Sequence, residues 1–227
     1  MTWILYHQGS FGPYFPDGNF TDREAKFEAE FERVATDAEK ENYGGAFHAF
    51  KSANLVPFTR PTEPAKPFQQ VSHFQLNRPQ KDIADVLQVT NRMNVVSAPV
   101  MKIIQKYEPD AVQFWPIDIV TKRGQPASEK SFFAMLVMKS RDAFRPDAST
   151  EESCRESFAG SNQWHVEGYK KSFLTGLALE TKKIDGAHIW FEERVITNVL
   201  FCSPDLGAEL SGGGFKLPPK FVQCISV

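Results

Sequence analysis

The chain is organised around residues Val95–Val120, which read Val-Val-Ser-Ala-Pro-Val-Met-Lys-Ile-Ile-Gln-Lys-Tyr-Glu-Pro-Asp-Ala-Val-Gln-Phe-Trp-Pro-Ile-Asp-Ile-Val. Ser97 is expected to cap a helix, because its hydroxyl can accept a hydrogen bond from an unpaired amide at the helix start. Pro99 then falls in the first turn, where its missing N–H costs nothing. Apolar residues follow at helical spacing until Pro109 ends the segment. These residues, which predict a short amphipathic helix, are Val100, Ile103, Ile104 and Tyr107.

The second half of this stretch changes to the periodicity of a strand. Apolar residues alternate with others between Val112 and Ile119, and this alternation predicts a β-strand. Pro116 indicates an edge position or a bulge in that strand, because proline has no N–H to donate to a neighbouring strand. Phe132–Met138 is a second run, apolar on both faces, and is typical of a buried central strand.

The same order of signals returns near the C-terminus. Val199–Cys202 is an apolar run, Ser203-Pro204 is again a serine followed by proline, and Leu206 and Leu210 have helical spacing. Serine before proline is common at the starts of unrelated helices. A true internal repeat and a chance similarity therefore both stay open.

The remaining segments complete the prediction of an α+β fold, with a mixed or mostly antiparallel sheet, a few short helices and one longer N-terminal helix. The longer helix is expected at Asp22–Lys40, because Thr21–Glu24 has the pattern of a capping box and an apolar stripe follows it. Four prolines within Lys51–Pro67 indicate an irregular connection. We therefore divide the chain into an N-terminal element, residues 1–80, packed on a main domain, residues 81–227.

Several shorter segments carry local patterns. Trp3–Tyr6 predicts a first strand, and Asp82–Leu87 predicts a helical turn. Ser149–Glu152 has the pattern of a second capping box. Ser172–Leu179 and His188–Phe191 flank an Asp-Gly pair, which is typical of a hairpin turn.

Composition and charge argue against several classes of protein. The 227 residues include 26 basic and 28 acidic side chains, for a formal net charge of -2, which gives no reason to expect binding to nucleic acid. The three cysteines form no CxxC pair and have no histidine at metal-ligand spacing, so we expect reduced thiols and neither a metal nor another cofactor. We expect a cytoplasmic protein, because no segment has the pattern of an export signal or of a membrane span.

Candidate catalytic residues are few. His165 and Glu167 would project from one face of a strand, and Cys154 lies beside Arg155, whose charge can lower the pKa of a thiol. With a scattered aspartate, these residues would form the site of a hydrolase or a modifying enzyme. Separately, Asp118, Asp142 and Asp147 could meet as paired carboxylates, although nothing in their spacing requires it. A structural histidine is the simpler interpretation of His165, because two ligands are too few for a metal site.

Two groups of residues are candidates for contact with a partner protein. The first is a set of glutamates on one flank of the predicted helix, which form either an acidic ridge or an ordinary solvated face. They are Glu24, Glu28, Glu32 and Glu39. The second is the aromatic set Phe11, Tyr14 and Phe15 in a loop rich in glycine and proline, which either folds back onto the core or waits for a partner.

The order of the motifs also resembles that of a known family. It runs from Asp85-Val-Leu through the Ser97 helix to Glu108-Pro-Asp-Ala-Val-Gln-Phe-Trp-Pro-Ile117, continues with Phe132–Met138 and Arg141–Phe144, and ends with Ser203–Leu210, glycine and Phe215. Over about residues 82–217 the chain thereby resembles a domain of bacterial polymorphic-toxin immunity proteins, typified by a myxobacterial immunity protein. Phe144 departs from the usual aliphatic residue. The motifs are structural, and none is a catalytic signature.

What the resemblance implies is a cytoplasmic protein, not an enzyme, that binds and neutralises a cognate bacterial toxin encoded by a neighbouring gene. The residues before the resemblance are where an individual member would carry its own recognition surface. We therefore expect the glutamates and aromatic residues named above to contact the toxin. An enzyme with a site around His165, Glu167 and Cys154 is the alternative, and a scaffold domain that associates with itself is a third hypothesis. The oligomeric state stays open.

Overall fold

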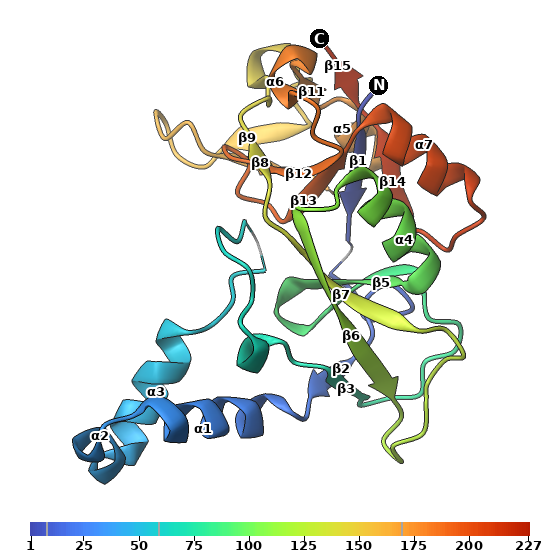
Figure 1. Cartoon of the computed structure of the whole chain (residues 1–227). Helices are drawn as coiled ribbons and strands as arrows, with labels where there is room; N and C mark the ends of the chain where they lie inside the picture. The colour runs from blue at the N-terminus through green and yellow to red at the C-terminus, as the bar shows by residue number, and fades with distance from the viewer. Residues whose placement is uncertain (8, 59, 169) are drawn as a thin grey trace.

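Two β-sheets form the body of the protein (Figure 1). The computed structural model describes residues 1–7, 9–58, 60–168 and 170–227. The larger sheet has the order β2-β3-β6-β7-β5-β4, and its strands are β2 (Gly18–Phe20), β3 (His73–Leu76), β4 (Val86–Val89), β5 (Met93–Ser97), β6 (Val112–Val120) and β7 (Phe132–Val137). The smaller sheet has the order β14-β1-β13-β12-β8, and its strands are β1 (Trp3–Tyr6), β8 (Ser140–Arg141), β12 (Ile189–Glu192), β13 (Val199–Cys202) and β14 (Lys220–Gln223).

Short strand pairs and helices complete the α+β fold. β9 (Cys154–Glu156) pairs with β10 (Trp164–Val166), and β11 (Ala178–Leu179) pairs with β15 (Ile225–Ser226). The α-helices are α1 (Arg23–Val34), α2 (Asp37–Glu41), α3 (Tyr43–Ala53), α4 (Ala98–Tyr107), α5 (Lys171–Thr175), α6 (Thr181–Ile184) and α7 (Pro204–Gly212). Most strand pairs are antiparallel, whereas β3 with β6, β8 with β12 and β11 with β15 are parallel. The predicted fold class is confirmed.

Residues 98–120 form the helix and the strand that their periodicity predicts, and β5 leads directly into the helix. The helix, α4, buries Val100 and Ile104. Ser97 has the extended backbone of a helix cap, but its side chain makes no capping hydrogen bond, so that part of the prediction is wrong. Pro116 is exposed and pairs with β7, while β3 joins β6 only from Asp118 onward among the described strands, which leaves proline at an edge position.

Each of the two serine–proline motifs belongs to a unit of four neighbouring strands, and the two units have the same strand order. The order β6-β7-β5-β4 in the larger sheet corresponds to β14-β1-β13-β12 in the smaller one, with antiparallel neighbours in both. The register also corresponds. In the larger sheet, Val96, the residue before Ser97, pairs with Val86, the first residue of β4. In the smaller sheet, Cys202, the residue before Ser203, pairs with Ile189, the first residue of β12. The two serine–proline motifs therefore lie at equivalent positions in two groups of strands with the same topology. The second group takes one of its strands, β1, from the N-terminal end of the chain.

The inner faces of the two sheets share one hydrophobic core. Val96 and Ile104 contribute from the larger sheet and α4, and Cys202 and Leu206 contribute from the smaller sheet and α7. The outer faces have separate cores, because successive residues of a strand point to opposite sides. One surrounds Phe74, Val95 and Trp115, and the other surrounds Ile4, Trp190 and Phe201.

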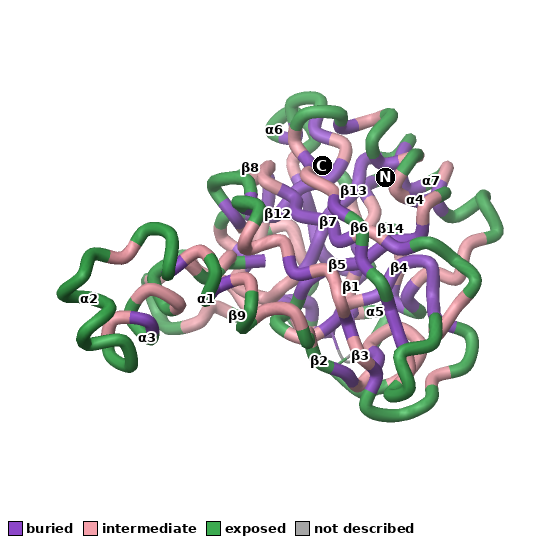
Figure 2. Tube along the Cα trace, turned by 60° about the horizontal axis from the view of Figure 1, so that its bottom comes forward, coloured by how far each residue is buried: buried purple, intermediate pink, exposed green. Residues whose placement is uncertain are grey.

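The predicted single helix Asp22–Lys40 is wrong, because α1 ends at Val34 and Ala35 is extended. Thr36 and Glu39 then form a capping box, whose reciprocal hydrogen bonds start the new helix α2. The helices α1, α2 and α3 project together from the body (Figure 1). Figure 2 shows α2 far from the sheets and largely exposed. We call residues Asp22–Asn54 the helical arm.

Several local predictions fail where contacts distant in sequence prevail. Thr21–Glu24 forms no capping box, since the Asp22 carboxylate instead accepts hydrogen bonds from the amide and the hydroxyl of Ser72, at 2.8 and 2.9 Å. Asp82–Leu87 leads into β4 without a helical turn, and Ser149–Glu152 forms a turn before β9. The predicted hairpin around Asp185-Gly186 is absent from the described residues, because β12 pairs with β13 and β8.

The first predicted strand is confirmed as β1, which lies in the smaller sheet between β13 and β14. β2 and β3 lie in the larger sheet, so strands from the first 80 residues enter both sheets. The division of the chain at residue 80 stays a prediction.

Candidate functional site

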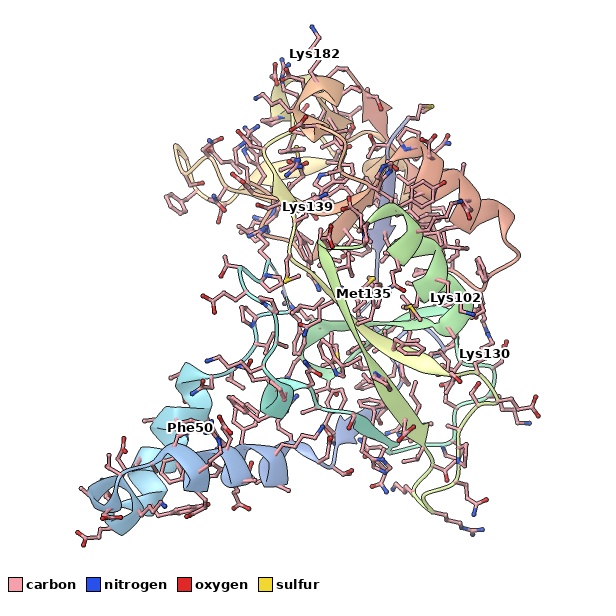
Figure 3. The ribbon with its side chains drawn as sticks, viewed as in Figure 1. Phe50, Lys102, Lys130, Met135, Lys139 and Lys182 are labelled. Carbon is pink, nitrogen blue, oxygen red and sulfur yellow. The ribbon has the colours of Figure 1, made fainter. Side chains whose placement is uncertain are left out.

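The helical arm has a small aromatic core of its own. Phe27, Phe31 and Phe47 are buried within it. The ring of Phe31 lies 5.4 Å from that of Phe47 and 5.5 Å from that of Phe50, which Figure 3 shows on α3 facing α1. Phe68, from the 3-10 turn Pro67–Gln69, packs against Phe27 and Phe50 and so joins the arm to the body.

Negative charge accumulates toward the outer end of the arm. Residues 22–54 contain eight acidic and five basic side chains, and residues 28–45 alone contain six acidic and two basic ones. α2 buries none of its residues. An acidic and exposed surface of this kind attracts a positively charged partner and speeds the encounter with it.

The structure places all four predicted glutamates on the arm and leaves each of them exposed. They do not form one unpaired ridge. The carboxylate of Glu24 lies 2.7 Å from the Lys51 ammonium, and that of Glu28 accepts a hydrogen bond from the Tyr43 hydroxyl at 3.1 Å. Glu32 lies 3.7 Å from the ammonium of Lys40, and Glu39 accepts hydrogen bonds from Thr36. These partners reduce the charge that another protein would meet, but exposed pairs of this kind are weak and can exchange partners.

The aromatic loop lies elsewhere, along β4 at the edge of the larger sheet. The Tyr14 carbonyl accepts a hydrogen bond from the Gln88 amide at 2.9 Å. Phe11 is 66% exposed and stacks on Phe15 at 5.3 Å, and Tyr14 and Phe15 are half-buried. Within the described ranges, no hydrogen bond, ion pair or ring contact joins Phe11, Tyr14 or Phe15 to the arm. The predicted set is therefore divided between two surfaces.

The residues of the alternative enzyme site do not meet in one cavity. His165 lines a cavity of about 350 Å³ together with His7, Arg92 and Asn198, among others. Glu167 is held instead by Arg155, at 2.7 Å. Cys154 is buried, and burial raises the pKa of its thiol, which opposes formation of the nucleophilic thiolate.

The three candidate aspartates are also dispersed over different partners. Asp118 faces His73 at 4.0 Å, Asp142 pairs with Arg194, and Asp147 pairs with Arg145 at 2.6 Å. In the part of the chain that the structure describes, no three histidine, cysteine or acidic side chains are grouped to hold a metal ion.

A serine–histidine pair that no sequence pattern predicts lies at the start of α7. The Ser203 hydroxyl is 2.8 Å from His188 Nδ1, and the Glu108 carboxylate accepts a hydrogen bond from the backbone amide of His188. Ser203 is buried, and its hydroxyl also accepts a hydrogen bond from the Leu206 amide at the start of α7. This pair thus connects the capped start of α7 to the residue directly before β12.

Comparison with known proteins identifies the family. No helix among the described residues combines the length and the apolarity that crossing a membrane requires. A search of curated proteins found no match. The immunity protein family Imm11 matches residues 24–216, so the match starts well before the expected residue 82 and includes the helical arm from Glu24 onward. Because the matched range spans most of the chain, the protein belongs to the Imm11 family of immunity proteins.

Proposed function

We propose that this protein binds a cognate bacterial toxin and neutralises it by covering the active or functional surface of the toxin. Membership of the immunity protein family is the observation that carries the proposal. The toxin is expected to be encoded by a neighbouring gene and to be met in the cytoplasm. The protein acts through its surface, without catalysis of its own.

The helical arm is the surface that we assign to this contact. It projects from the body and carries eight acidic side chains, including Glu24, Glu28, Glu32 and Glu39. Such a surface suits a toxin with a basic face, because complementary charge raises the association rate and selects the partner. Phe11, stacked on Phe15 beside Tyr14, is a second contact that we assign to the aromatic loop, since exposed aromatic side chains often supply the desolvated centre of an interface.

Co-expression with the adjacent gene tests the proposal. The product of that gene should arrest growth when produced alone, and this protein should restore growth and copurify with it in a stable complex. Absence of both rescue and complex would contradict the proposal. Rescue without a complex would favour the alternative, an enzyme that modifies the toxin.

A charge test examines the arm separately. Reversal of the four glutamates to lysine should slow association most at low salt, because long-range attraction is screened at high salt. Reversal of Glu151 and Glu152, two exposed glutamates in the turn before β9, is the control. An association rate that is the same for both variants would remove the glutamates from the contact.

A further inference from the structure

We propose that the groove between α1 and α3 receives the apolar side chains of a basic, amphipathic segment of the toxin. This inference rests on the proposed function and names the place where the arm meets its partner. It concerns a different edge of the arm from the glutamates that pair with Tyr43 and Lys51.

The groove has a volume of about 300 Å³ and runs along α3. Phe31 and Phe50 line it, and Ala46, Ala49 and Ala53 form one wall. Its volume lies at the lower limit of the range typical of ligand sites, about 300–1,000 Å³. It therefore suits one or two side chains of a protein partner better than a cofactor.

The groove is a part of the surface of α1 and α3 that the packing of these two helices leaves uncovered. Two helices in contact cover only one stripe of each other. On one edge of the α1–α3 pair, Tyr43 packs against Phe31 and Lys51 pairs with Glu24. On the groove edge, Val34 is 46% exposed and Ala49 and Ala53 are exposed. Apolar surface that stays open beside a charged rim is typical of a docking site.

Charge identifies the kind of occupant. Glu39 lines the groove, and the outer part of the arm beyond Glu28, residues 30–45, has five acidic and two basic side chains. A second copy of this chain would bring the same negative charge against the groove, which disfavours self-association there. A segment with lysine or arginine beside aliphatic residues meets both the apolar walls and the acidic rim.

The decisive experiment compares Ala49→Arg with Ala29→Arg. Both alanines are exposed on helices of the arm, but only Ala49 lines the groove, so both variants should fold and carry the same added charge. The probe is the polypeptide encoded by the adjacent gene, produced in an inactive form. Ala49→Arg should weaken its binding by about 30-fold or more, as loss of a central interface contact does, and Ala29→Arg should change it less than about threefold.

A photo-crosslinking amino acid at position 49 gives an independent readout. We expect it to attach to a lysine- or arginine-containing segment of the probe, whereas the same group at position 29 should not react with the probe. Equal binding by the two arginine variants, or crosslinking of position 49 to a second copy of this chain, would overturn the groove proposal and leave the proposed function intact. If the unaltered protein forms no complex with the probe, that result contradicts both the proposed function and the groove proposal.

Discussion

The body and the arm of this protein are stabilised by contacts of different range. In the body, residues from opposite ends of the chain pair with each other, as Trp3 does with Cys202. In the arm, the buried rings lie within residues 27–47, and α2 has no buried residue. The comparison suggests that the body fixes the shape while the arm, which depends on local contacts, offers a surface that can change without loss of the fold.

Removal of a large side chain from the outer core of the smaller sheet should have the largest effect on stability. Phe201 is fully buried and stacks on Trp190 at 6.1 Å. Phe201→Ala should lower the free energy of unfolding by about 4 kcal/mol, through lost burial and the cavity left behind. This change in the free energy of unfolding is measured by denaturant unfolding monitored by circular dichroism. Phe158→Ala, at a residue 70% exposed, is the matched control and should change stability by less than about 0.5 kcal/mol. Similar losses for both would contradict the packing described for this core.

The same truncation in the arm should act locally. Phe31 is 2% exposed and contacts Tyr43, Phe47 and Phe50. Phe31→Ala should lower the free energy of opening the arm by about 3 kcal/mol, because its core has few other large side chains. Hydrogen exchange should accelerate across α1 and α3 while β7 stays protected. If β7 loses protection to the same extent, the arm and the body form one cooperative unit and the comparison fails.

Acid should destabilise the body through His7. This histidine is buried, neither ring nitrogen has a hydrogen-bond partner among the described residues, and burial lowers its pKa from 6.5 to about 3. The unfolded chain therefore takes up the proton first, and stability present above pH 6.5 is lost as the pH falls toward 3. Between pH 6.5 and pH 5 the loss should be about 2 kcal/mol.

The His7→Gln variant isolates this effect, because it removes the titrating group. Its free energy of unfolding, measured in denaturant at several pH values, should depend less on pH over this range than that of the unaltered protein. His48→Gln, at an exposed position of the arm, should keep the original dependence. An unchanged slope in His7→Gln would exclude His7 as the acid-sensitive group.

The sequence predicts the two regions unequally well. Serine with proline one or two residues later marks the starts of α4 and α7, and the run Phe132–Met138 identifies the central strand β7, because these signals are local and agree with the tertiary packing. The single-helix prediction does not contain the break at Ala35, although Thr36 and Glu39 have the spacing of a capping box, because the acidic pattern continues from α1 into α2. The pairing of Glu24 with Lys51 and the groove lined by Ala49 follow only once that break folds α3 back onto α1, so neither is visible in a single-helix interpretation.

The capping box provides the smallest test of the comparison. The Thr36 hydroxyl accepts a hydrogen bond from the Glu39 amide at 3.3 Å, and the Glu39 carboxylate accepts one from the Thr36 amide at 2.8 Å. Thr36→Ala should lower the stability of α2 by about 1 kcal/mol, the usual loss when a cap is removed. Hydrogen exchange should therefore accelerate within α2, with no change in β5 or β7. Ser52→Ala, at an exposed position inside α3, is the control and should not accelerate exchange, because alanine favours a helix interior. If exchange in the rest of the arm accelerates as much as in α2, the capping box stabilises the whole arm. The bend between α1 and α2 would then be required for the groove beside it to form.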